Sequence, residues 1–213
     1  MLSMSLIRSP RLDNVTIQQM RAVEYWFSYC NRPVKYQDDS FENWCGLSED
    51  ALPSQEVIKE LEPYYVARFA PYDTEHRWGS KSILHIIDYW NGGNHVHKWF
   101  VDHVQNGKDD YKVHQECTKI ALEELLDACK HVIASADPAH AAKKWLLSDE
   151  KAQEQYNEYS DFDINGVERT MNIIENVLAT TDLKKQKIYY CSHWSKKSMN
   201  MWWARNRLNH KQW

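Results

Sequence analysis

A stretch in the middle of the chain repeats apolar residues at helical spacing and is the strongest helical signal in the sequence. The steps alternate between four and three residues, which places the members on one face of an α-helix. Gly92 and Gly93 each cost a helix about 1 kcal/mol relative to alanine, so two helices broken there remain an alternative. We predict one helix over residues 80–105, ended by Asn106-Gly107. Its inward face comprises Ile83, Ile87, Trp90, Asn94, His97, Val101 and Val104.

Other helical patterns occupy much of the remaining chain. The segment 187–194 is the best strand candidate, because it is rich in residues that favour strands. We therefore predict a mainly α protein, a compact single-domain helical fold with at most a small β element, formed by residues 1–194. The further helices are expected at 15–27, from Pro53 or Ser54 to before Pro63, at 114–134, from Pro138 onward, and after Asn165-Gly166.

Aromatic residues are unusually frequent. The 213 residues include ten Trp and twelve Tyr but only six Gly and six Pro, and 43% of the chain is hydrophobic. A chain of this length and composition is long enough to bury one core. Large flat side chains with polar tips suit pockets as well as cores. The sequence therefore predicts a core or a cleft with aromatic walls.

Several classes of protein are excluded by composition. No run approaches the ~18 apolar residues needed to cross a bilayer, and the first ten residues do not read as a secretory signal. The five cysteines are scattered, odd in number and form no CxxC pair, which favours reduced thiols in a cytoplasm. We expect a cytoplasmic protein without a membrane partner.

The C-terminal residues 195–213 form a basic aromatic tail. This tail has five basic residues and no acidic one, so subtraction from the totals of 26 and 30 leaves the first 194 residues with 21 basic and 30 acidic residues, a net charge of −9 against +5. Such asymmetry favours docking of the tail on an acidic surface of its own chain or of a sister subunit in a homo-oligomer. One short basic stretch is a weak nucleic-acid signal, so nucleic-acid binding is not expected.

Two polar residues interrupt the apolar face of the predicted central helix. An amide or imidazole buried without a partner costs a few kcal/mol, so Asn94 and His97 must meet each other, another polar group, water or a ligand. An internal hydrogen-bonded pair and a lined pocket both satisfy this demand. In the pocket interpretation, Trp90, Asn94 and His97 bind the ligand, with Tyr89, Tyr190 and His193 contributed nearby.

A metal site is not expected. His95 and His97 point about 200° apart on a helix and cannot share an ion. His114 and Cys117, with Cys191 and His193, form the one zinc-like set, but their spacing matches no standard zinc pattern.

Catalytic motifs are also lacking. A two-histidine phosphoesterase needs two His-x-Ser/Thr tripeptides, and only the one that starts at His193 is present. There is no phosphate-binding glycine loop, nucleophile elbow or HExxH. The acidic pairs Asp38-Asp39 and Asp109-Asp110 are interpreted as solvated loops. We predict no catalytic residue and no cofactor, and favour a protein that is not an enzyme.

One motif resembles a known family. It comprises Tyr89-Trp90, Asn94, His97-Lys98-Trp99-Phe100-Val101, Val104-Gln105, Gly107 and Asp109-Asp110. This pattern resembles uncharacterised tailed-bacteriophage proteins with a Tyr-Trp-x3-Asn-x2-His-x-Trp-Phe-Val motif. The chain departs from that family at 91–93, where Asn-Gly-Gly replaces Arg-Lys-Ala. The resemblance implies a phage origin, residence in the bacterial host cytoplasm and an uninterrupted central helix, but it implies no activity.

These observations favour a binding protein. We expect a phage accessory protein that acts on the host, as a counter-defence protein that sequesters a small, polar, nucleotide-like signal in an aromatic pocket. The alternatives are an inhibitor that binds a host protein and a nucleotide hydrolase that uses His97 or His193 as acid or base.

Overall fold

The protein is known from a computed structural model, which describes seven segments of the chain. They are residues 2–31, 40–42, 48–67, 81–90, 94–110, 113–147 and 162–194. The chain divides into two compact units. The first comprises Met1–Ile7, Ile87–Leu183 and Lys187–Trp213, and the second comprises Arg8–Ile86 and Lys184–Gln186.

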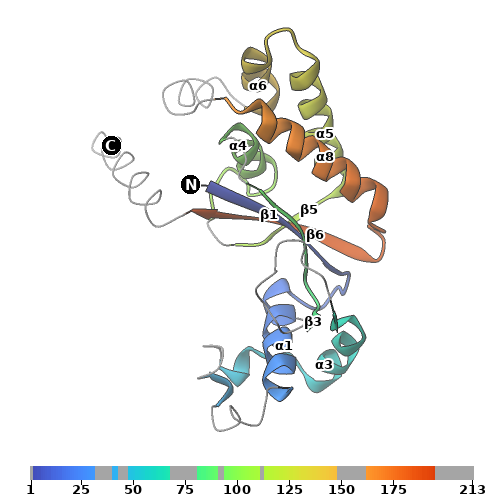
Figure 1. Ribbon diagram of the computed structural model, residues 1–213. Helices are drawn as coiled ribbons and strands as arrows, with labels where there is room; N and C mark the ends of the chain where they lie inside the picture. Colours follow the sequence, from blue (N-terminus) through green and yellow to red (C-terminus); the bar gives the residue numbers. More distant parts are fainter. Residues whose placement is uncertain are drawn as a thin grey trace, which may run out of the picture. The chain divides into compact units, whose positions relative to one another are not determined.

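A four-stranded antiparallel sheet has the strand order β4-β1-β6-β5. Strands β5 and β6 pair with Gln115 opposite Tyr190, and the Ser5 hydroxyl on β1 donates to the Cys191 carbonyl on β6 at 3.4 Å. The first and last strands of the described residues, β1 and β6, are thus neighbours at the centre of the sheet (Figure 1). The bounds are β1 (Leu2–Pro10), β4 (His85–Trp90), β5 (Gln115–Cys117) and β6 (Gln186–Trp194).

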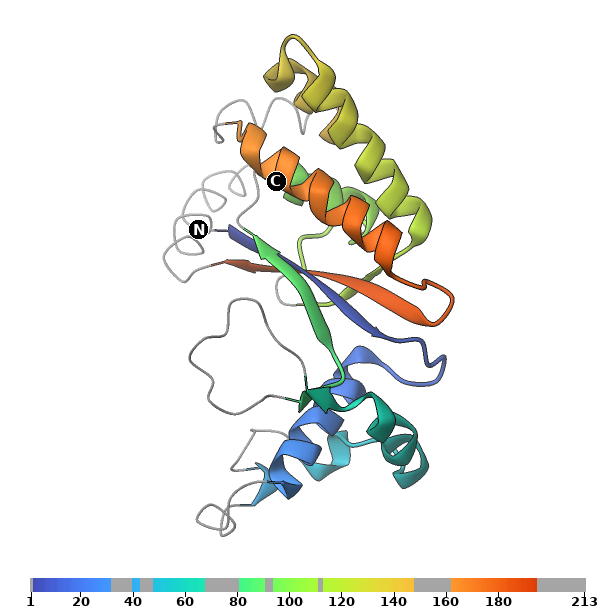
Figure 2. The same cartoon turned by 45° about the vertical axis from the view of Figure 1, so that its right-hand side comes forward.

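The helices of the first unit lie over one face of this sheet (Figures 1 and 2). Helix α5 packs against both α6 and α8. Its apolar residues recur at steps of three and four, so the face they form is buried. The main core lies between α5 and the side chains of the sheet. It includes Met4, Leu6, Phe100 and Tyr190. The bounds are α4 (Asn94–His103), α5 (Lys119–Ala134), α6 (Pro138–Leu146) and α8 (Ile164–Thr180).

Helix ends in this unit have local causes in the sequence. The Thr118 side chain accepts the Ala121 N–H at the start of α5. Asp137 accepts the His140 N–H at the start of α6, where Pro138 occupies the first turn. Both arrangements satisfy N–H groups that a helix leaves without an internal partner.

The second unit is built around α1. Thr16 and Gln19 form a capping box at its start. A two-stranded antiparallel ribbon, β2 with β3, pairs Val66 with Ser82, and the Phe27 ring of α1 lies 4.9 Å from the Tyr65 ring. The bounds are α1 (Ile17–Cys30), η2 (Glu49–Ala51), α3 (Gln55–Leu61), η3 (Glu62–Tyr64), β2 (Val66–Ala67) and β3 (Lys81–Ser82).

The predicted mainly α, all-helical fold class is wrong. In the part of the chain that the structure describes, six helices accompany a four-stranded antiparallel sheet, so the chain is a mixed α and β protein. The sheet is not a small element, because three of its strands lie outside the one segment expected to be extended. Residues 2–6 alternate apolar and serine residues, which is a strand period. Ser5 is nevertheless buried, because β1 is an inner strand of the sheet.

The single helix predicted over residues 80–105 is also wrong. Its first half forms β3 and β4, and only the part from Asn94 onward is the helix α4. The isoleucines and aromatic residues of β4 favour a strand, and Gly92-Gly93 lies between the two elements. The stop at Asn106-Gly107 is confirmed, because both residues have a positive φ and α4 ends at His103.

The other helix predictions hold with shifted ends. Helix α1 begins after Thr16 rather than after Asp13 or Asn14, and residues 115–117 form β5 ahead of α5. The tail, residues 195–213, lies outside the described residues.

Candidate functional site

Helix α4 carries His97 on its buried side. Val96, Trp99 and Phe100 on the same helix are also buried, so the helix is enclosed on most of its circumference. An imidazole in such a place needs polar partners.

Both ring nitrogens of His97 have partners. Nδ1 lies 2.7 Å from the Tyr190 hydroxyl, and Nε2 lies 3.2 Å from Oδ2 of Asp109. A carboxylate oxygen can only accept, so Nε2 carries a proton and donates it to Asp109. In the tautomer with its single proton on Nε2, Nδ1 accepts from the Tyr190 O–H. This assignment makes Asp109, His97 and Tyr190 a continuous chain of hydrogen bonds.

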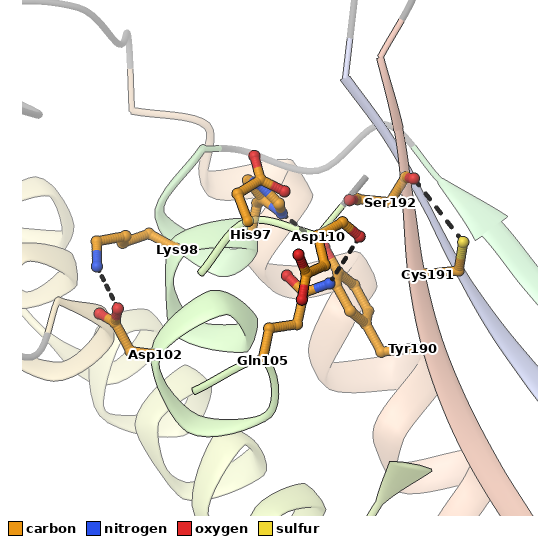
Figure 3. A network of polar contacts seen from close by, with 9 residues as sticks. His97, Lys98, Asp102, Gln105, Asp110, Tyr190, Cys191 and Ser192 are labelled. Atoms are coloured by element: carbon orange, nitrogen blue, oxygen red, sulfur yellow. Dashed lines mark hydrogen bonds and ion pairs between the residues drawn. The ribbon is translucent and has the colours of Figure 1, made fainter. Parts of the chain in front are cut away.

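Tyr190 reaches His97 from β6. Its ring is fully buried and stacks on Phe100 with 3.9 Å between centroids and 6° between planes. Residues two apart on a strand project from the same face, so Ser192 follows Tyr190 on the side that faces α4. Figure 3 shows the Ser192 hydroxyl directed from β6 toward His97 and the segment that carries Asp110.

Asp109 is brought back to His97 by the turn after α4. Asn106 and Gly107 have φ values of 55° and 78°, which is the left-handed conformation that ends many helices. The Gly107 N–H donates to the Val101 carbonyl at 2.8 Å. After this reversal the chain runs beside α4, where the Gln105 Nε2 donates to the Asp110 carbonyl at 3.3 Å.

Oε1 of Gln105 and Oγ of Ser192 are among the buried polar atoms of this region that have no hydrogen-bond partner within the described segments. Gln105 is 2% exposed and Ser192 is 0% exposed. Leaving such an atom unsatisfied costs about 1–3 kcal/mol. Native proteins therefore supply a partner to most buried polar groups, from the chain, from internal water or from a ligand.

The cluster borders the protein surface at its acidic end. The Asp109 and Asp110 side chains are 23% and 28% exposed. The neighbouring lysines are already paired. Lys98 pairs with Asp102 (Figure 3), and Lys108 pairs with Asp110. We call His97, Asp109, Tyr190, Gln105 and Ser192 the His97 cluster.

Comparison with protein-family models, with curated proteins and with solved structures finds no match in any of the three. The phage resemblance therefore rests on the sequence motif alone.

Trp90 and Tyr89 lie on β4 and have different surroundings. Trp90 is buried in the core, where its Nε1–H donates to Oγ1 of Thr170 at 3.1 Å. Tyr89 is 47% exposed, and its carbonyl accepts from Arg169 at 3.2 Å. Because Trp90 belongs to a strand, the helical face that was expected to join it to Asn94 and His97 does not exist.

The remaining predicted residues are only partly described. Asn94 begins α4 and His193 lies in β6, but the side chains of both lie outside the described part of the structure. The structure joins two of the six predicted site residues directly, His97 and Tyr190.

Three residues of the His97 cluster were not predicted as site residues. Asp109 was interpreted as solvated, although the Asn106-Gly107 turn before it indicates that the chain reverses there. The position of Ser192 two residues after Tyr190 on the predicted strand is a signal for a shared face. Gln105 has a weaker signal, a polar residue at the end of the helix that was predicted over residues 80–105.

The cysteines of the zinc-like set are enclosed. Burial raises the pKa of the Cys117 thiol. This thiol therefore stays protonated at neutral pH, and a protonated thiol is a poor metal ligand. Within the described segments, no group of three or more His, Cys, Asp or Glu residues could hold a metal ion. None of the described helices combines the length and the apolar character needed to cross a membrane.

Proposed function

We propose that this chain is a binding protein and that the His97 cluster is where it contacts a small polar molecule. The observation that supports this proposal is the pair of unpartnered buried oxygens on Gln105 and Ser192 within the described segments. They lie near the His97 imidazole, whose orientation is fixed by hydrogen bonds at both ring nitrogens. Held polar groups beside unused hydrogen-bonding atoms are typical of ligand sites.

The geometry favours binding over catalysis. A general base needs a nitrogen that can reach substrate, but both nitrogens of His97 are occupied by protein groups. Tyr190 is fully buried and donates to His97. In the proposed site, the Asp109–His97–Tyr190 chain holds the walls in place, while Gln105 and Ser192 contact the ligand.

The biological setting follows from the sequence motif. Because the motif resembles tailed-phage proteins, we propose that the bound molecule belongs to the bacterial host and is a nucleotide-like signal. Sequestration by a phage protein would lower the free concentration of such a signal without changing it chemically.

Native mass spectrometry of the full chain purified from bacterial cells tests this proposal. We expect a bound mass that denaturation releases intact, and that Ser192→Ala and Gln105→Leu reduce. Gln18→Leu, at an exposed position of α1, is the matched control. A chain that carries no small molecule and depletes nothing from a panel of cyclic nucleotides and ADP-ribose derivatives would contradict the proposal. An altered released product would instead indicate an enzyme.

A further inference from the structure

The hydrogen-bonding character of the His97 cluster restricts what can bind there. The Gln105 amide is oriented by its own contact, because Nε2 donates to the Asp110 carbonyl. Flipping the amide would set two carbonyl oxygens against each other. Oε1 is therefore the unused atom, and it can only accept a hydrogen bond.

The other atoms of the cluster add mainly acceptors. The Nε2–H of His97 and the O–H of Tyr190 are already used within the cluster. Asp109 is a carboxylate and accepts only. The Ser192 hydroxyl can accept as well as donate, and the second N–H of the Gln105 amide is a further donor of the set.

The charge of this region also favours a ligand group that donates hydrogen bonds over an anion. Asp109 and Asp110 lie at its partly exposed end. Two lysines of the described segments form ion pairs here, Lys98 with Asp102 and Lys108 with Asp110, and neither of these pairs includes Asp109. A phosphate brought to these acceptors would meet like charge, while both lysines are already occupied.

We infer that the group seated at the His97 cluster is a neutral or cationic nitrogen donor, such as the amino edge of a nucleobase or an amidine, and not a phosphate. This inference rests on the proposed binding function. In a nucleotide-like ligand, the base would face Gln105 and Ser192, and the phosphate would lie away from Asp109.

Four probes separate these possibilities on the unmodified full chain, by calorimetric titration. Adenosine carries the 6-amino group, and purine riboside is the same molecule without it. Benzamidine is a cationic donor, and inorganic phosphate is the anion. We expect adenosine to bind roughly tenfold or more tightly than purine riboside, since a lost hydrogen bond to a buried acceptor has about this effect. Benzamidine should bind and phosphate should not.

Variants then assign the difference to the cluster. Gln105→Leu should reduce the adenosine preference to about onefold, and Gln105→Glu should strengthen benzamidine binding because it adds a carboxylate. Gln18→Glu is the charge-matched control, and thermal melting checks that each variant folds.

Each outcome supports or overturns a distinct claim. If phosphate binds, or if a bound probe shows no dependence on its amino group, the donor inference is wrong while the binding function stands. If no probe binds and no small molecule co-purifies, the binding function itself is wrong.

Discussion

His95 and His97 lie two positions apart on α4 and meet different surroundings. His97 is held by Asp109 and Tyr190. His95 is buried edge-on against Phe162. Burial, together with the nearby positive charge of Lys143, lowers the pKa of His95 to about 4. Charging His95 therefore opposes folding.

The His95 pKa predicts an acid-sensitive contribution to stability. Because the folded pKa of about 4 lies below the ordinary histidine value of 6.5, the contribution is complete above pH 6.5 and is lost as pH falls through 4. Between pH 7 and pH 4.5 this amounts to about 2 kcal/mol. His95→Phe should reduce the loss of unfolding free energy over that range by this amount, measured by urea denaturation. His140→Phe, at an exposed position, should leave the loss unchanged, and an equal effect of the two variants would refute the assignment.

Glu24 is a second buried ionisable group. Its Oε1 accepts the N–H groups of Ile83 and Leu84 at 2.5 and 2.6 Å, and also the Ser82 hydroxyl. Burial is the largest influence on this carboxyl and raises its pKa, although these hydrogen bonds and the charge of Arg21 act in the opposite direction. The carboxyl therefore holds the turn between β3 and β4.

Glu24→Gln keeps the accepting oxygen and removes the buried charge. We expect its unfolding free energy at pH 7 to stay within about 1 kcal/mol of the original chain, whereas Glu24→Ala leaves the buried donors unpaired and should cost about 3 kcal/mol. A raised folded pKa means that the stability contribution is complete below the unfolded pKa and falls as pH rises through the folded pKa. Glu24→Gln should therefore also remove this decline. If Gln proves as damaging as Ala, the charge itself is required.

At the residue scale, the sequence predicted that a buried imidazole requires hydrogen-bond partners, but it did not predict which residues these partners are. A histidine on an apolar helical face needs a hydrogen-bond partner, and His97 has one in the Tyr190 hydroxyl. Its partner Tyr190 lies 93 positions away, a separation that no local pattern encodes. Asp109 is only 12 positions away, yet an acidic pair after a turn also fits a solvated loop.

Secondary-structure elements divide into those with local causes and those without. Helices α3, α5, α6 and α8 follow periodicity, caps and proline positions, so they were predicted with shifted ends. Strand β4 lies in a segment whose apolar spacing also fits a helix. Only pairing with β1 decides between the two. Pairing is a non-local property, which explains why the sheet was missed.

The turn that ends α4 is an element-scale test of the site. Gly107 has a φ of 78°, and a Cβ added there would meet nothing within 4 Å, so the strain of Gly107→Ala comes from the backbone alone. We expect it to cost about 1 kcal/mol and to disturb the contact between Asp109 and His97, seen as a shift of the His97 imidazole NMR signals. Asn106→Gly, at a φ of 55°, should be neutral or slightly stabilising. Equal effects of both substitutions would show that the turn does not position Asp109.

At the scale of the whole molecule, β6, the last strand among the described residues, is central to the first unit. Strand β6 lies between β1 and β5, and it supplies Tyr190 and Ser192 to the His97 cluster. The unit can therefore be completed only after the C-terminal part of the chain is available. The basic tail, residues 195–213, begins directly after this strand.

The tail carries +5 and residues 1–194 carry −9, so truncation after Trp194 tests whether the tail docks on acidic surface. We expect the truncated chain to melt a few degrees lower than the full chain at low salt. The difference should shrink at high salt, because the screening length falls from about 30 Å at 0.01 M to about 3 Å at 1 M. Truncation after Lys185 removes β6 as well and should prevent the first unit from folding.

A full-length variant with the five tail cations changed to glutamine separates charge from aromatic burial. They are Lys196, Lys197, Arg205, Arg207 and Lys211. If charge causes docking, this variant should melt like the truncated chain at low salt, and the two should differ little from the full chain at high salt. If the tryptophans of the tail cause docking, the variant should melt like the full chain at both low and high salt. An unchanged melting temperature after truncation, together with a lost affinity for nucleic acid, would show that the tail binds a nucleic-acid partner, because the cations would then contact phosphates and not the acidic residues of this chain.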